Sequence, residues 1–398
     1  MKILFTCHYT FNTNAGAAGV TWRLGRDYER LGHETEYYSL DNLPSRLHPL
    51  VKVAAFPEFV ACRIAALERQ QRVDVVDAST GDGWLWAALN RKRQTRPLII
   101  ARCHGLEHIE HEEYVEEVER GNLRLSWKYP FYRGSIRLWE AAASMRYADL
   151  VLLLNQRDRD YAIEKLGVDP DLAHIVPNGI PESFLNQLFQ PLTDPSTIRI
   201  AQIGTYILRK GVHYGTPALN TILTRYPNVE VTFLGTECSP DTTNSIAQVY
   251  ADFDPSVRDR VQVIPHYRHE TLPDLLTGHH IKLFPTISEG FGVALVEAMA
   301  CGLAPITTAT PGPLEIVRDE HDAIVVPCRD SGAIEQALDK LICDRAYLER
   351  LRRNAYETAQ TYSWSRIAQQ NLALYEKVSH LRNVTDRNLH FSKAHPSP

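Results

Sequence analysis

The segment PTISEGFGVALVEAMACGLAPI, residues 285–306, decides the fold. It overlaps the end of an apolar run, IKLFPT (281–286), that is typical of a buried strand, and an apolar helical pattern begins at about Phe291. Gly290 and Gly292 lie between the two, where glycine lets backbone N–H groups approach a ligand at the N-terminus of a helix. The segment therefore predicts a strand, a glycine turn and a helix of an α/β domain, with a turn suited to an anion such as a diphosphate.

Short β-branched runs alternate with helical patterns along the rest of the chain, and a polar stretch at 190–196 divides them into two series. The first series is KILFTCH (2–8), ETEYYSL (34–40), VDVVDAS (73–79), PLIIARCH (97–104), DLVLLLN (149–155) and AHIVPN (173–178). The second series is IRIAQIG (198–204), VEVTFLG (229–235), VQVIP (261–265), IKLFPT (281–286), LAPITT (303–308) and AIVVP (323–327). This rhythm predicts two doubly wound domains with parallel sheets and a hinge near 178–197. We expect the active site in the cleft between the domains, at the carboxyl ends of the strands.

The composition excludes several classes of protein. The chain has 398 residues, a net charge of −5 and a pI near 6.4, so it lacks the basic character of a nucleic-acid-binding protein. Its seven cysteines form no C-x-x-C pair, which is typical of a reducing cytosol. The opening residues are too short an apolar run for a signal peptide, and no run reaches the roughly 18 apolar residues of a membrane span. We therefore expect a cytoplasmic protein.

Two carboxylates of the segment need an explanation. Glu297 lies inside an otherwise apolar helical pattern, and a buried carboxylate requires a strong partner, which the hydroxyl groups of a sugar would provide. Glu289 directly precedes the glycine turn. The alternative is that Glu289 is solvated in a loop and that Glu297 pairs with a neighbouring arginine.

The pattern as a whole has Glu289 and Glu297 with seven residues between them, G-F-G after the first and EAMACGLAPI from the second. It resembles the donor-site signature of the retaining family 4 glycosyltransferases, also called glycosyl transferases group 1. VPNGI (176–180) and TPGPLEIV (310–317) resemble further segments of that family. The resemblance implies the GT-B fold, an α/β architecture of two Rossmann-like doubly wound parallel-sheet domains that face a central cleft. It also implies transfer of a sugar from a nucleotide-sugar donor to a glycan, lipid-linked or small-molecule acceptor, with the nucleotide sugar as substrate and no cofactor.

The same resemblance sets the domain boundaries. Residues 1–185 would form the N-terminal acceptor-binding domain and residues 186–360 the C-terminal nucleotide-sugar donor domain. TYSWSRIA (361–368) resembles the start of a C-terminal helix, residues 361–380, that crosses back to the N-terminal domain. Residues 381–398 are polar with little periodicity, so we expect a loose tail.

The segment IGTYILRKG (203–211) resembles the first strand and phosphate loop of the family's donor domain, in which a lysine neutralises the diphosphate. Lys210 matches that lysine. The arginine that usually follows Gly204 is absent, because Thr205 stands there, so Arg209 is the candidate for the second positive charge. The base preference stays open, because HYRHETLPDLL, which stands where the family places its nucleobase-binding turn, departs from the usual residues.

Further site residues lie in the N-terminal half. CHGLEHIEH (103–111) ends the fourth strand, and His104 matches a histidine that the family presents to the donor sugar. NAGAAG (14–19) lies between the first strand and the first helix, where it forms either a ligand-binding glycine turn or a plain strand-to-helix turn. The implied catalytic residues are Lys210, Glu289 and His104. The implied donor-binding residues are Gly16, Gly204, Arg209, Lys210, Gly290, Phe291, Gly292, Val293 and Glu297.

The expected reaction needs no metal. The chain has three Asp-x-Asp pairs, none of them in a motif that resembles a donor site. Lys210, Arg209 and the helix start at Gly292 offer positive potential for a leaving diphosphate. His104 and the histidines after it lack the further ligands of a zinc site. Retention at the anomeric carbon follows from the family resemblance.

Two other functions fit parts of the sequence. A nucleotide-sugar epimerase or phosphorylase on the same fold would bind the same kind of donor without a separate acceptor. A nicotinamide-dependent oxidoreductase is suggested only by the repeated α/β pattern, and NAGAAG (14–19) lacks G-x-G-x-x-G.

The charge changes sign between residues 107 and 146. Seven acidic residues at 107–119 are followed by Arg120, Arg124, Lys128, Arg133, Arg137 and Arg146, among which stand Trp127, Tyr129, Phe131, Tyr132 and Trp139. We favour two charge blocks that pair in a helical hairpin. The alternative is contact with anionic lipid headgroups at the inner face of the membrane, or with a phosphorylated acceptor.

Overall fold

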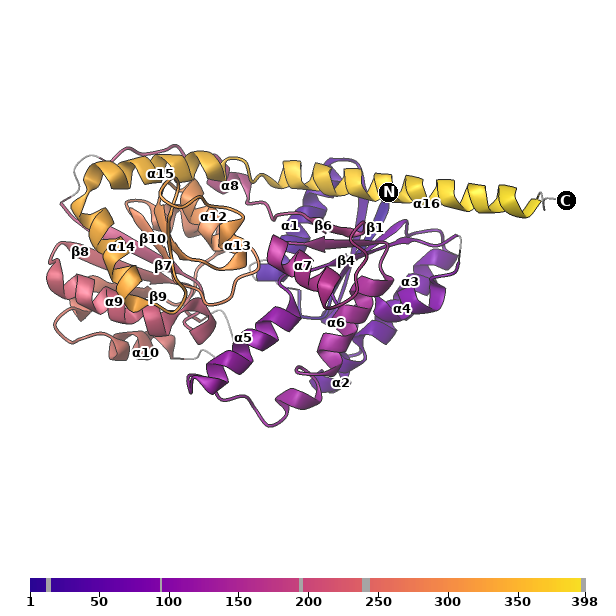
Figure 1. Cartoon of the computed structure of the whole chain (residues 1–398), viewed down its shortest axis with the longest axis horizontal. Helices are drawn as coiled ribbons and strands as arrows, with labels where there is room; N and C mark the ends of the chain where they lie inside the picture. The colour runs from indigo at the N-terminus through magenta and orange to yellow at the C-terminus, as the bar shows by residue number, and fades with distance from the viewer. Residues whose placement is uncertain (12–15, 94, 193–195, 238–243, 395–398) are drawn as a thin grey trace. The chain divides into compact units, whose positions relative to one another are not determined.

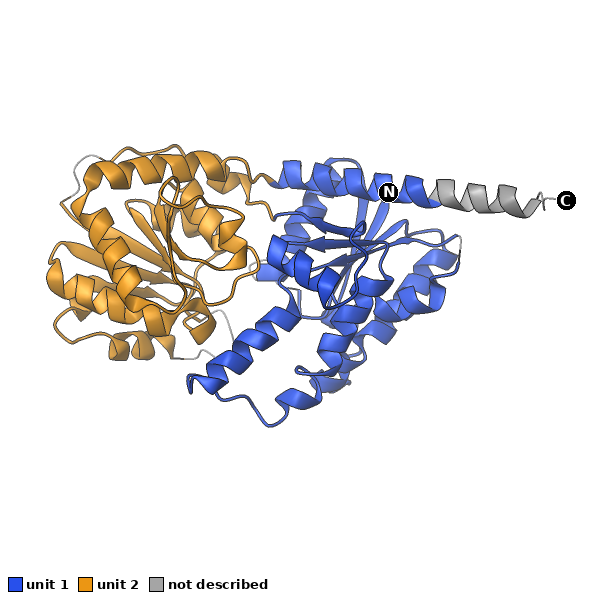
Figure 2. Cartoon of the chain, viewed as in Figure 1, with its two compact units in different colours: residues 1–177, 364–398 blue, residues 178–363 orange. Residues whose placement is uncertain are grey.

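The chain forms two compact units in the computed structural model, which describes residues 1–11, 16–93, 95–192, 196–237 and 244–394, with side chains to residue 382. Unit 1 comprises residues 1–177 and 364–398, and unit 2 comprises residues 178–363 (Figure 2). The domain boundaries that the sequence predicts, 185/186 and 360/361, lie eight and three residues from these limits. Each unit has its own sheet and its own hydrophobic core.

Unit 1 contains a six-stranded parallel sheet with the order β2-β1-β3-β4-β5-β6 (Figure 1). The strands are β1 (Lys2–Cys7), β2 (Glu34–Ser39), β3 (Val75–Ser79), β4 (Leu98–Arg102), β5 (Leu150–Leu153) and β6 (Ala173–Ile175). Every residue of β3, β4 and β5 is buried, because helices cover both faces of a doubly wound sheet. Continuous apolar runs in the sequence therefore predict these strands well.

Helices cover the sheet of unit 1 (Figure 1). They are α1 (Gly16–Arg30), η1 (Leu40–Asn42), α2 (Pro49–Ala54), α3 (Phe56–Arg69), α4 (Trp84–Asn90), α5 (Glu107–Glu119), η2 (Tyr129–Phe131), α6 (Ile136–Tyr147), α7 (Gln156–Glu164) and α16 (Trp364–Ala394). The helix α3 is amphipathic, because Phe56, Val60 and Ile64 recur every four residues and therefore lie on one face. All three are fully buried in one core cluster with Leu4 of β1.

A buried polar network joins α16 to the sheet of unit 1. The guanidinium of Arg102 donates to the two carboxylate oxygens of Asp77, at 2.8 and 2.7 Å. The hydroxyl of Tyr375 on α16 donates to Asp77 at 2.6 Å and accepts from Arg102 at 2.9 Å. Tyr28 of α1 donates to the same hydroxyl at 3.2 Å. Because the buried carboxylate and guanidinium are paired with each other, the network holds α16 without leaving an isolated charge.

The helix α16 extends beyond the helix that the sequence predicts. The sequence predicts a helix to residue 380 and a loose tail from 381, whereas the backbone is helical to Ala394. Polar residues can extend a helix once preceding turns have nucleated it, because each added residue gains a hydrogen bond without the cost of nucleation. Apolar periodicity therefore shows where a helix packs and not where it ends.

Unit 2 contains a second six-stranded parallel sheet, with the order β12-β11-β10-β7-β8-β9 (Figure 1). The strands are β7 (Ile198–Ile203), β8 (Val229–Leu234), β9 (Val261–Ile264), β10 (Ile281–Phe284), β11 (Ala304–Thr308) and β12 (Ile324–Val326). Every residue of β10 and β11 is buried, as expected for central strands of a parallel sheet. Both units are thus doubly wound, which confirms the predicted fold class.

The helices of unit 2 are α8 (Glu182–Leu185), η3 (Leu208–Lys210), α9 (Val212–Arg225), α10 (Ser245–Asp252), η5 (Arg258–Arg260), η6 (His269–Thr271), α11 (Leu272–Leu276), α12 (Val293–Ala300), α13 (Pro311–Leu314), α14 (Ser331–Cys343) and α15 (Arg345–Ala359). Asp330 and Asp344 start α14 and α15, because each carboxylate accepts a hydrogen bond of 2.8 Å from the backbone N–H three residues further on. Both caps are visible in the sequence as an aspartate before a helical pattern.

Candidate functional site

The strand order of each sheet reverses at one point. In unit 2 the chain proceeds outward from β7 through β8 to β9, and outward on the other side from β10 through β11 to β12. The strands β7 and β10 therefore flank the switch point of unit 2, and β1 and β3 flank that of unit 1. Ligands of doubly wound sheets bind at the carboxyl ends of the strands that flank such a point. The loops after β7 and β10 are therefore the candidate site of unit 2.

An ion pair joins these two loops. Lys210 ends η3, and its Nζ donates a hydrogen bond of 2.6 Å to Oε2 of Glu289, which lies in the loop after β10. The two side chains are only 19% and 15% exposed. Burial opposes the ionisation of Glu289, yet the positive charges of Lys210 and Arg209 hold its pKa below the usual value. Glu289 is therefore an ionised, paired carboxylate and not a solvated loop residue.

The backbone of the two loops is tied together as well. The carbonyl oxygen of Arg209 accepts hydrogen bonds from Oγ1 of Thr286 at 2.9 Å and from the N–H of Ile287 at 3.0 Å. Gly211 has a φ of 71°, and a Cβ there would lie 1.7 Å from the carbonyl oxygen of Pro285. Only glycine allows this close approach. The phosphate-loop candidate and the glycine-turn segment are therefore fixed relative to each other.

The helix α12 begins at Val293, two residues later than the sequence predicts. Gly292 caps it with a φ of 100°, a left-handed conformation that favours glycine. Phe291 is buried with its ring 5.8 Å from the ring of Tyr362, so its side chain packs inside unit 2. Gly290 and Val293 are half-buried. The first N–H groups of α12 lie beside this turn. They form the N-terminus of the helix, which is the end that attracts an anion.

Most of the predicted donor-binding set meets at these loops. Gly204 follows β7 with a φ of 124°, and a Cβ there would lie 3.6 Å from Cε of Lys210. Lys210, Arg209 and Glu289 are linked as described, and Gly290 to Gly292 form the turn into α12, which begins at Val293. What the structure establishes is this proximity, and the role of each residue toward a donor stays a prediction.

Glu297 is buried on α12, and its partner is a histidine. Nε2 of His269 lies 2.7 Å from Oε1 of Glu297, although the two residues are 28 positions apart. His269 begins η6, in the segment expected to form the nucleobase-binding turn, and its ring lies 5.3 Å from the ring of Phe184. Sequence reasoning expects sugar hydroxyls or an arginine as the partner of Glu297, so it missed His269.

Lys282 of β10 is a second residue that sequence reasoning missed. Its side chain is fully buried, and its Nζ has no hydrogen-bond partner among the residues that the structure describes. This Nζ lies 5.2 Å from the centre of the Phe284 ring, and Nζ of Lys210 lies 5.6 Å from the same centre. Burial, with the nearby charge of Lys210, lowers the pKa of Lys282 well below its usual value. The signal in the sequence is the single lysine inside the apolar run IKLF.

The remaining predicted residues belong to unit 1. His104 follows β4, and its Nε2 is buried without a hydrogen-bond partner in the described part of the chain. Burial, with the charge of Arg102, lowers the pKa of His104 to about 3, so the imidazole is neutral at physiological pH. Gly16 is the exposed first residue of α1, and residues 12–15, which include the start of NAGAAG, lie outside the described residues.

Polar side chains also gather at the switch point of unit 1. Of these residues, sequence reasoning named only the charged side chains of α5 and α6. Nδ1 of His8, which follows β1, lies 2.8 Å from Oδ1 of Asp82, which follows β3 and is buried. Arg137 of α6 donates to Oε1 of Glu107 at 2.9 Å and lies 3.1 Å from Nε2 of His8. The signal in the sequence is GDG (81–83), which begins two positions after the end of a predicted strand (73–79).

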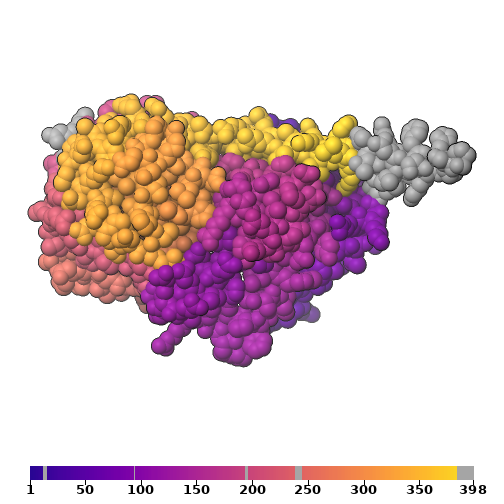
Figure 3. Space-filling view, viewed as in Figure 1, coloured from indigo at the N-terminus to yellow at the C-terminus, as the bar shows by residue number. Residues whose placement is uncertain are grey.

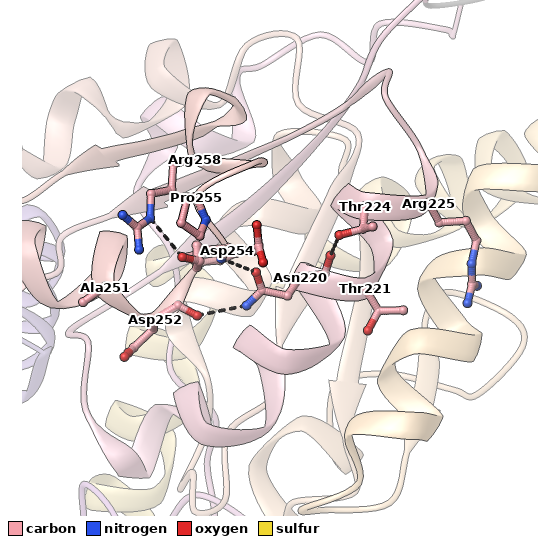
Figure 4. Close-up of a pocket in the computed structure, with 10 residues that line it drawn as sticks. Asn220, Thr221, Thr224, Arg225, Ala251, Asp252, Asp254, Pro255 and Arg258 are labelled. Atoms are coloured by element: carbon pink, nitrogen blue, oxygen red, sulfur yellow. Dashed lines mark hydrogen bonds between the residues drawn. The ribbon is translucent and has the colours of Figure 1, made fainter.

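A pocket between α9 and α10 of unit 2 is lined by none of the residues predicted for the donor site (Figure 4). Asn220 donates to the carbonyl oxygen of Asp252 and accepts from the N–H of Asp254, both at 2.9 Å. The carboxylates of this Asp-x-Asp pair accept hydrogen bonds from the hydroxyls of Tyr206 and Ser256. These side chains therefore stabilise the local fold.

No three His, Cys, Asp or Glu side chains gather closely enough to hold a metal ion within the described ranges. His111 instead lies with Nδ1 3.0 Å from the hydroxyl of Tyr129. The helices of the described chain include none that is long and apolar enough to cross a membrane. The cytoplasmic location stays a prediction.

Comparison with known proteins identifies the family. The family model "Glycosyltransferase Family 4" matches residues 14–184, and the model "Glycosyl transferases group 1" matches residues 185–358. A relative in Schizosaccharomyces pombe, the phosphatidylinositol N-acetylglucosaminyltransferase gpi3 subunit, is 24% identical over 245 residues, which are 59% of this chain and 50% of that protein. The match to this relative thus spans half of its length.

Two solved structures share the fold. Sucrose-phosphate synthase (tll1590) from Thermosynechococcus elongatus has a TM-score of 0.75 at 19% identity, over 95% of this chain and 99% of that chain. Anabaena Alr3699/HepE in complex with UDP-glucose has a TM-score of 0.67 at 18% identity, over 95% of this chain and 100% of that chain. The two doubly wound units, with a site at a switch point, define the class as GT-B. The chain belongs to glycosyltransferase family 4, the glycosyl transferases group 1, as predicted.

Proposed function

We propose that the chain transfers a sugar from a nucleotide-sugar donor to a separate acceptor. The observation that carries this proposal is the ion pair of Lys210 and Glu289 at the switch point of unit 2, beside the start of α12. A diphosphate brings the negative charge that a lysine and the N-terminus of a helix both attract. The similar fold of HepE, which was solved with UDP-glucose, supports a nucleotide sugar as the donor.

The donor site would work by an exchange of partners. Lys210 bonds to Glu289 in the structure, so a diphosphate that binds Lys210 must compete with this carboxylate. When Nζ of Lys210 turns to the phosphate, Glu289 becomes available to accept hydrogen bonds from the hydroxyls of the sugar. Arg209 adds positive charge near Glu289, and Glu297 would accept from the ribose hydroxyls. Each buried charge then keeps a partner before and after binding.

Unit 1 would bind the acceptor, which is a glycan, a lipid-linked sugar or a small molecule. The imidazole of His8 is oriented by the buried carboxylate of Asp82, and the guanidinium of Arg137 is paired with Glu107. Groups of this kind donate to and accept from sugar hydroxyls, and His8 and Asp82 lie at the carboxyl ends of the strands that flank the switch point of unit 1. His104 can contribute a neutral imidazole, which is the form suited to hydrogen bonds with an uncharged sugar.

The proposed transfer retains the anomeric configuration and needs no metal. Negative charge builds up on the diphosphate as its bond to the anomeric carbon breaks, and Lys210, Arg209 and the first N–H groups of α12 would stabilise that charge. The acceptor oxygen bonds to the anomeric carbon from the same face, and the departing phosphate oxygen takes the acceptor's proton. Retention is supported by the family resemblance, and metal independence by the positive groups around Glu289.

The test begins with a thermal-shift screen against UDP-, GDP- and ADP-sugars, in which a ligand at about 100 times its dissociation constant adds about 2.7 kcal/mol. The stabilising donor is then incubated with and without sugar acceptors, with and without EDTA, and proton NMR reads the anomeric proton of the product. We expect transfer with retention that EDTA leaves unchanged. Isomerised donor without acceptor would instead indicate an epimerase, and release that depends on phosphate would indicate a phosphorylase. An inverted product, or activity that EDTA abolishes and magnesium restores, would refute the proposed mechanism.

A further inference from the structure

A second pocket lies in unit 1, at the amino ends of its strands, and we call it the edge pocket. Its lining comes from the residues before β4, β5 and β6, from α7 and from α16, and its volume is about 930 Å³, which is the size of a small-molecule site. Figure 3 shows the yellow surface of α16 next to the magenta surface of the α7–β6 segment. The predicted residues His104 and Gly16 follow β4 and β1, so they belong to the opposite edge of the sheet.

Basic side chains dominate the lining of the edge pocket. Seven of the lining residues are arginine or lysine, whereas two, Asp149 and Asp171, are acidic. Three further carboxylates accept hydrogen bonds from lining residues, and they belong to Glu68, Asp160 and Asp169. Seven positive charges therefore stand against five negative ones even when all of these carboxylates are counted.

Three of the basic residues are paired with carboxylates. Arg93 donates to the two oxygens of Glu68 at 3.0 and 2.8 Å, and Arg96 donates to the two oxygens of Asp149 at 2.6 Å each. Arg382 lies 3.6 Å from the same Asp149, so two guanidinium groups share this carboxylate. The side chain of Arg96 is 6% exposed, and its Nε has no hydrogen-bond partner among the residues that the structure describes. The lining thus holds more buried donors than acceptors.

The other four basic residues of the edge pocket form no ion pair within the described ranges, and they are Arg91, Lys92, Arg159 and Lys377. Arg159 donates to the carbonyl oxygens of Ala173 and Pro170 at 2.9 and 3.3 Å. These bonds hold its guanidinium in place, but they leave its charge without a carboxylate. The guanidinium carbon of Arg91 lies 5.9 Å from the centre of the Tyr147 ring, which also lines the pocket.

The ring of His174 responds to the charge in the edge pocket. Burial lowers the pKa of His174, and the positive charges of Lys377 and Arg159 lower it further. Asp171 raises this pKa through its carbonyl oxygen, which lies 3.2 Å from Nε2, and through its carboxylate, whose effect is smaller than that of Lys377 or of Arg159. The positive charges therefore outweigh the carboxylate at this ring.

We propose that the edge pocket binds a small phosphate ester, such as a sugar phosphate or a nucleoside monophosphate. Guanidinium and ammonium groups form charge-assisted hydrogen bonds with phosphate oxygens, and the half-buried ring of Tyr147 offers a surface to the organic part of the ester. A nucleic acid fits less well, because the whole chain has a net charge of −5. The bound ester would bridge Lys377 of α16 to Arg159 of α7. This site does not depend on the proposed sugar transfer.

Isothermal titration of the full-length protein tests the site with AMP and ribose 5-phosphate, and with adenosine and ribose as their uncharged counterparts. The nucleoside diphosphate of the preferred donor is present at saturation, so that the proposed donor site of unit 2 is occupied. If no nucleoside diphosphate binds, the proposed function fails, and the titrations without it still test the edge pocket. We expect binding of the two phosphate esters alone, with an affinity that falls as the salt concentration rises.

Variants of exposed lysines test the position of the ligand. Lys92→Gln, Lys377→Gln should bind the esters at least about tenfold more weakly, because each lost ammonium removes a charge-assisted contact. Both lysines are exposed and donate no hydrogen bond in the part of the chain that the structure describes, so their replacement should preserve the fold. The matched control Lys52→Gln, Lys128→Gln removes the same charge from unit 1 outside the edge pocket and should bind the esters like the wild type.

Hydrogen exchange locates the ligand on the unmodified protein. Ribose 5-phosphate should slow the exchange of backbone amides at residues 170–175 and 374–382, and it should leave residues 285–293 of the predicted donor site unchanged. Uncharged counterparts that bind as tightly as the esters, a pocket variant that binds like its control, or protection confined to residues 285–293 would each overturn the proposal. Binding of heparin without binding of either ester would also overturn it and would assign the edge pocket to an extended polyanion.

Discussion

Replacement of Glu289 by glutamine should strengthen the binding of a nucleoside diphosphate while it slows sugar transfer. Nζ of Lys210 lies 2.6 Å from Oε2 of Glu289, so a phosphate must draw the lysine away from this carboxylate. Two unit charges about 4 Å apart attract by about 4 kcal/mol at an effective dielectric constant of about 20. Both side chains keep some contact with water, at 19% and 15% exposure, so the net attraction is nearer to about 1 kcal/mol. The variant should therefore bind the diphosphate about fivefold more tightly.

The rate of transfer should change in the opposite direction. A glutamine amide accepts hydrogen bonds from sugar hydroxyls less strongly than a carboxylate does, and hydrogen bonds to charged groups contribute about 1.5–3 kcal/mol. If those bonds tighten in the transition state, kcat should fall by roughly 10- to 100-fold. A single substitution that tightens nucleotide binding and slows sugar transfer would identify Glu289 as a carboxylate that competes with the diphosphate for Lys210.

Isothermal titration with the nucleoside diphosphate of the preferred donor measures the first effect, because this ligand lacks the transferred sugar that Glu289 would contact. Glu297→Gln is the matched control, since it removes one carboxylate of the same site that bonds to His269 and not to Lys210. We expect Glu297→Gln to weaken binding by about 1.5–3 kcal/mol through the lost ribose contact. Tighter binding in both variants would indicate a general charge effect. Weaker or unchanged binding in Glu289→Gln would refute the competition between Glu289 and the diphosphate.

Three further predictions address single side chains. Lys210→Ala should lower kcat more than it raises KM, because charge on the leaving diphosphate builds up in the transition state. If steady-state kinetics show a change in KM alone, Lys210 binds the substrate and the transition state equally and the predicted role is wrong. Lys282→Met should raise the unfolding free energy of unit 2 by about 1–3 kcal/mol, because an apolar chain replaces a buried amine to which no described residue offers a hydrogen bond. Since burial lowers the pKa of Lys282 well below 10.5, the unfolded chain holds a proton that the folded chain lacks. The wild type should therefore gain stability as the pH rises toward 10.5, and the variant should lack this gain. Urea unfolding at about pH 7 and pH 9 measures the stability of both proteins, and an equal change in the two proteins between these pH values would contradict the reasoning. Tyr375→Phe removes a hydroxyl that donates to Asp77 at 2.6 Å and should destabilise unit 1 by about 1–3 kcal/mol, whereas an unchanged urea midpoint would show that the network contributes little.

The sequence by itself determined the two sheets and the loops that carry the candidate site. Apolar runs such as LIIAR and IKLF, and the glycines at 290 and 292, are local signals, because strand burial and helix starts depend on neighbours in the chain. Lys210 and Glu289 could each be selected from its own motif. That they form an ion pair depends on the strand order, which sets β7 beside β10.

Only the tertiary structure decided which partners the buried polar groups have. Glu297 bonds to His269, 28 residues away, and Asp77 bonds to Tyr375, 298 residues away. The sequence shows that a charge inside an apolar pattern is costly, but the group that offsets the cost comes from whichever distant segment the fold brings within hydrogen-bond distance. Lys282 is the opposite case, since no described residue offers its Nζ a hydrogen bond. Local patterns therefore predict where side chains are buried, and the three-dimensional arrangement of segments decides which of them are paired.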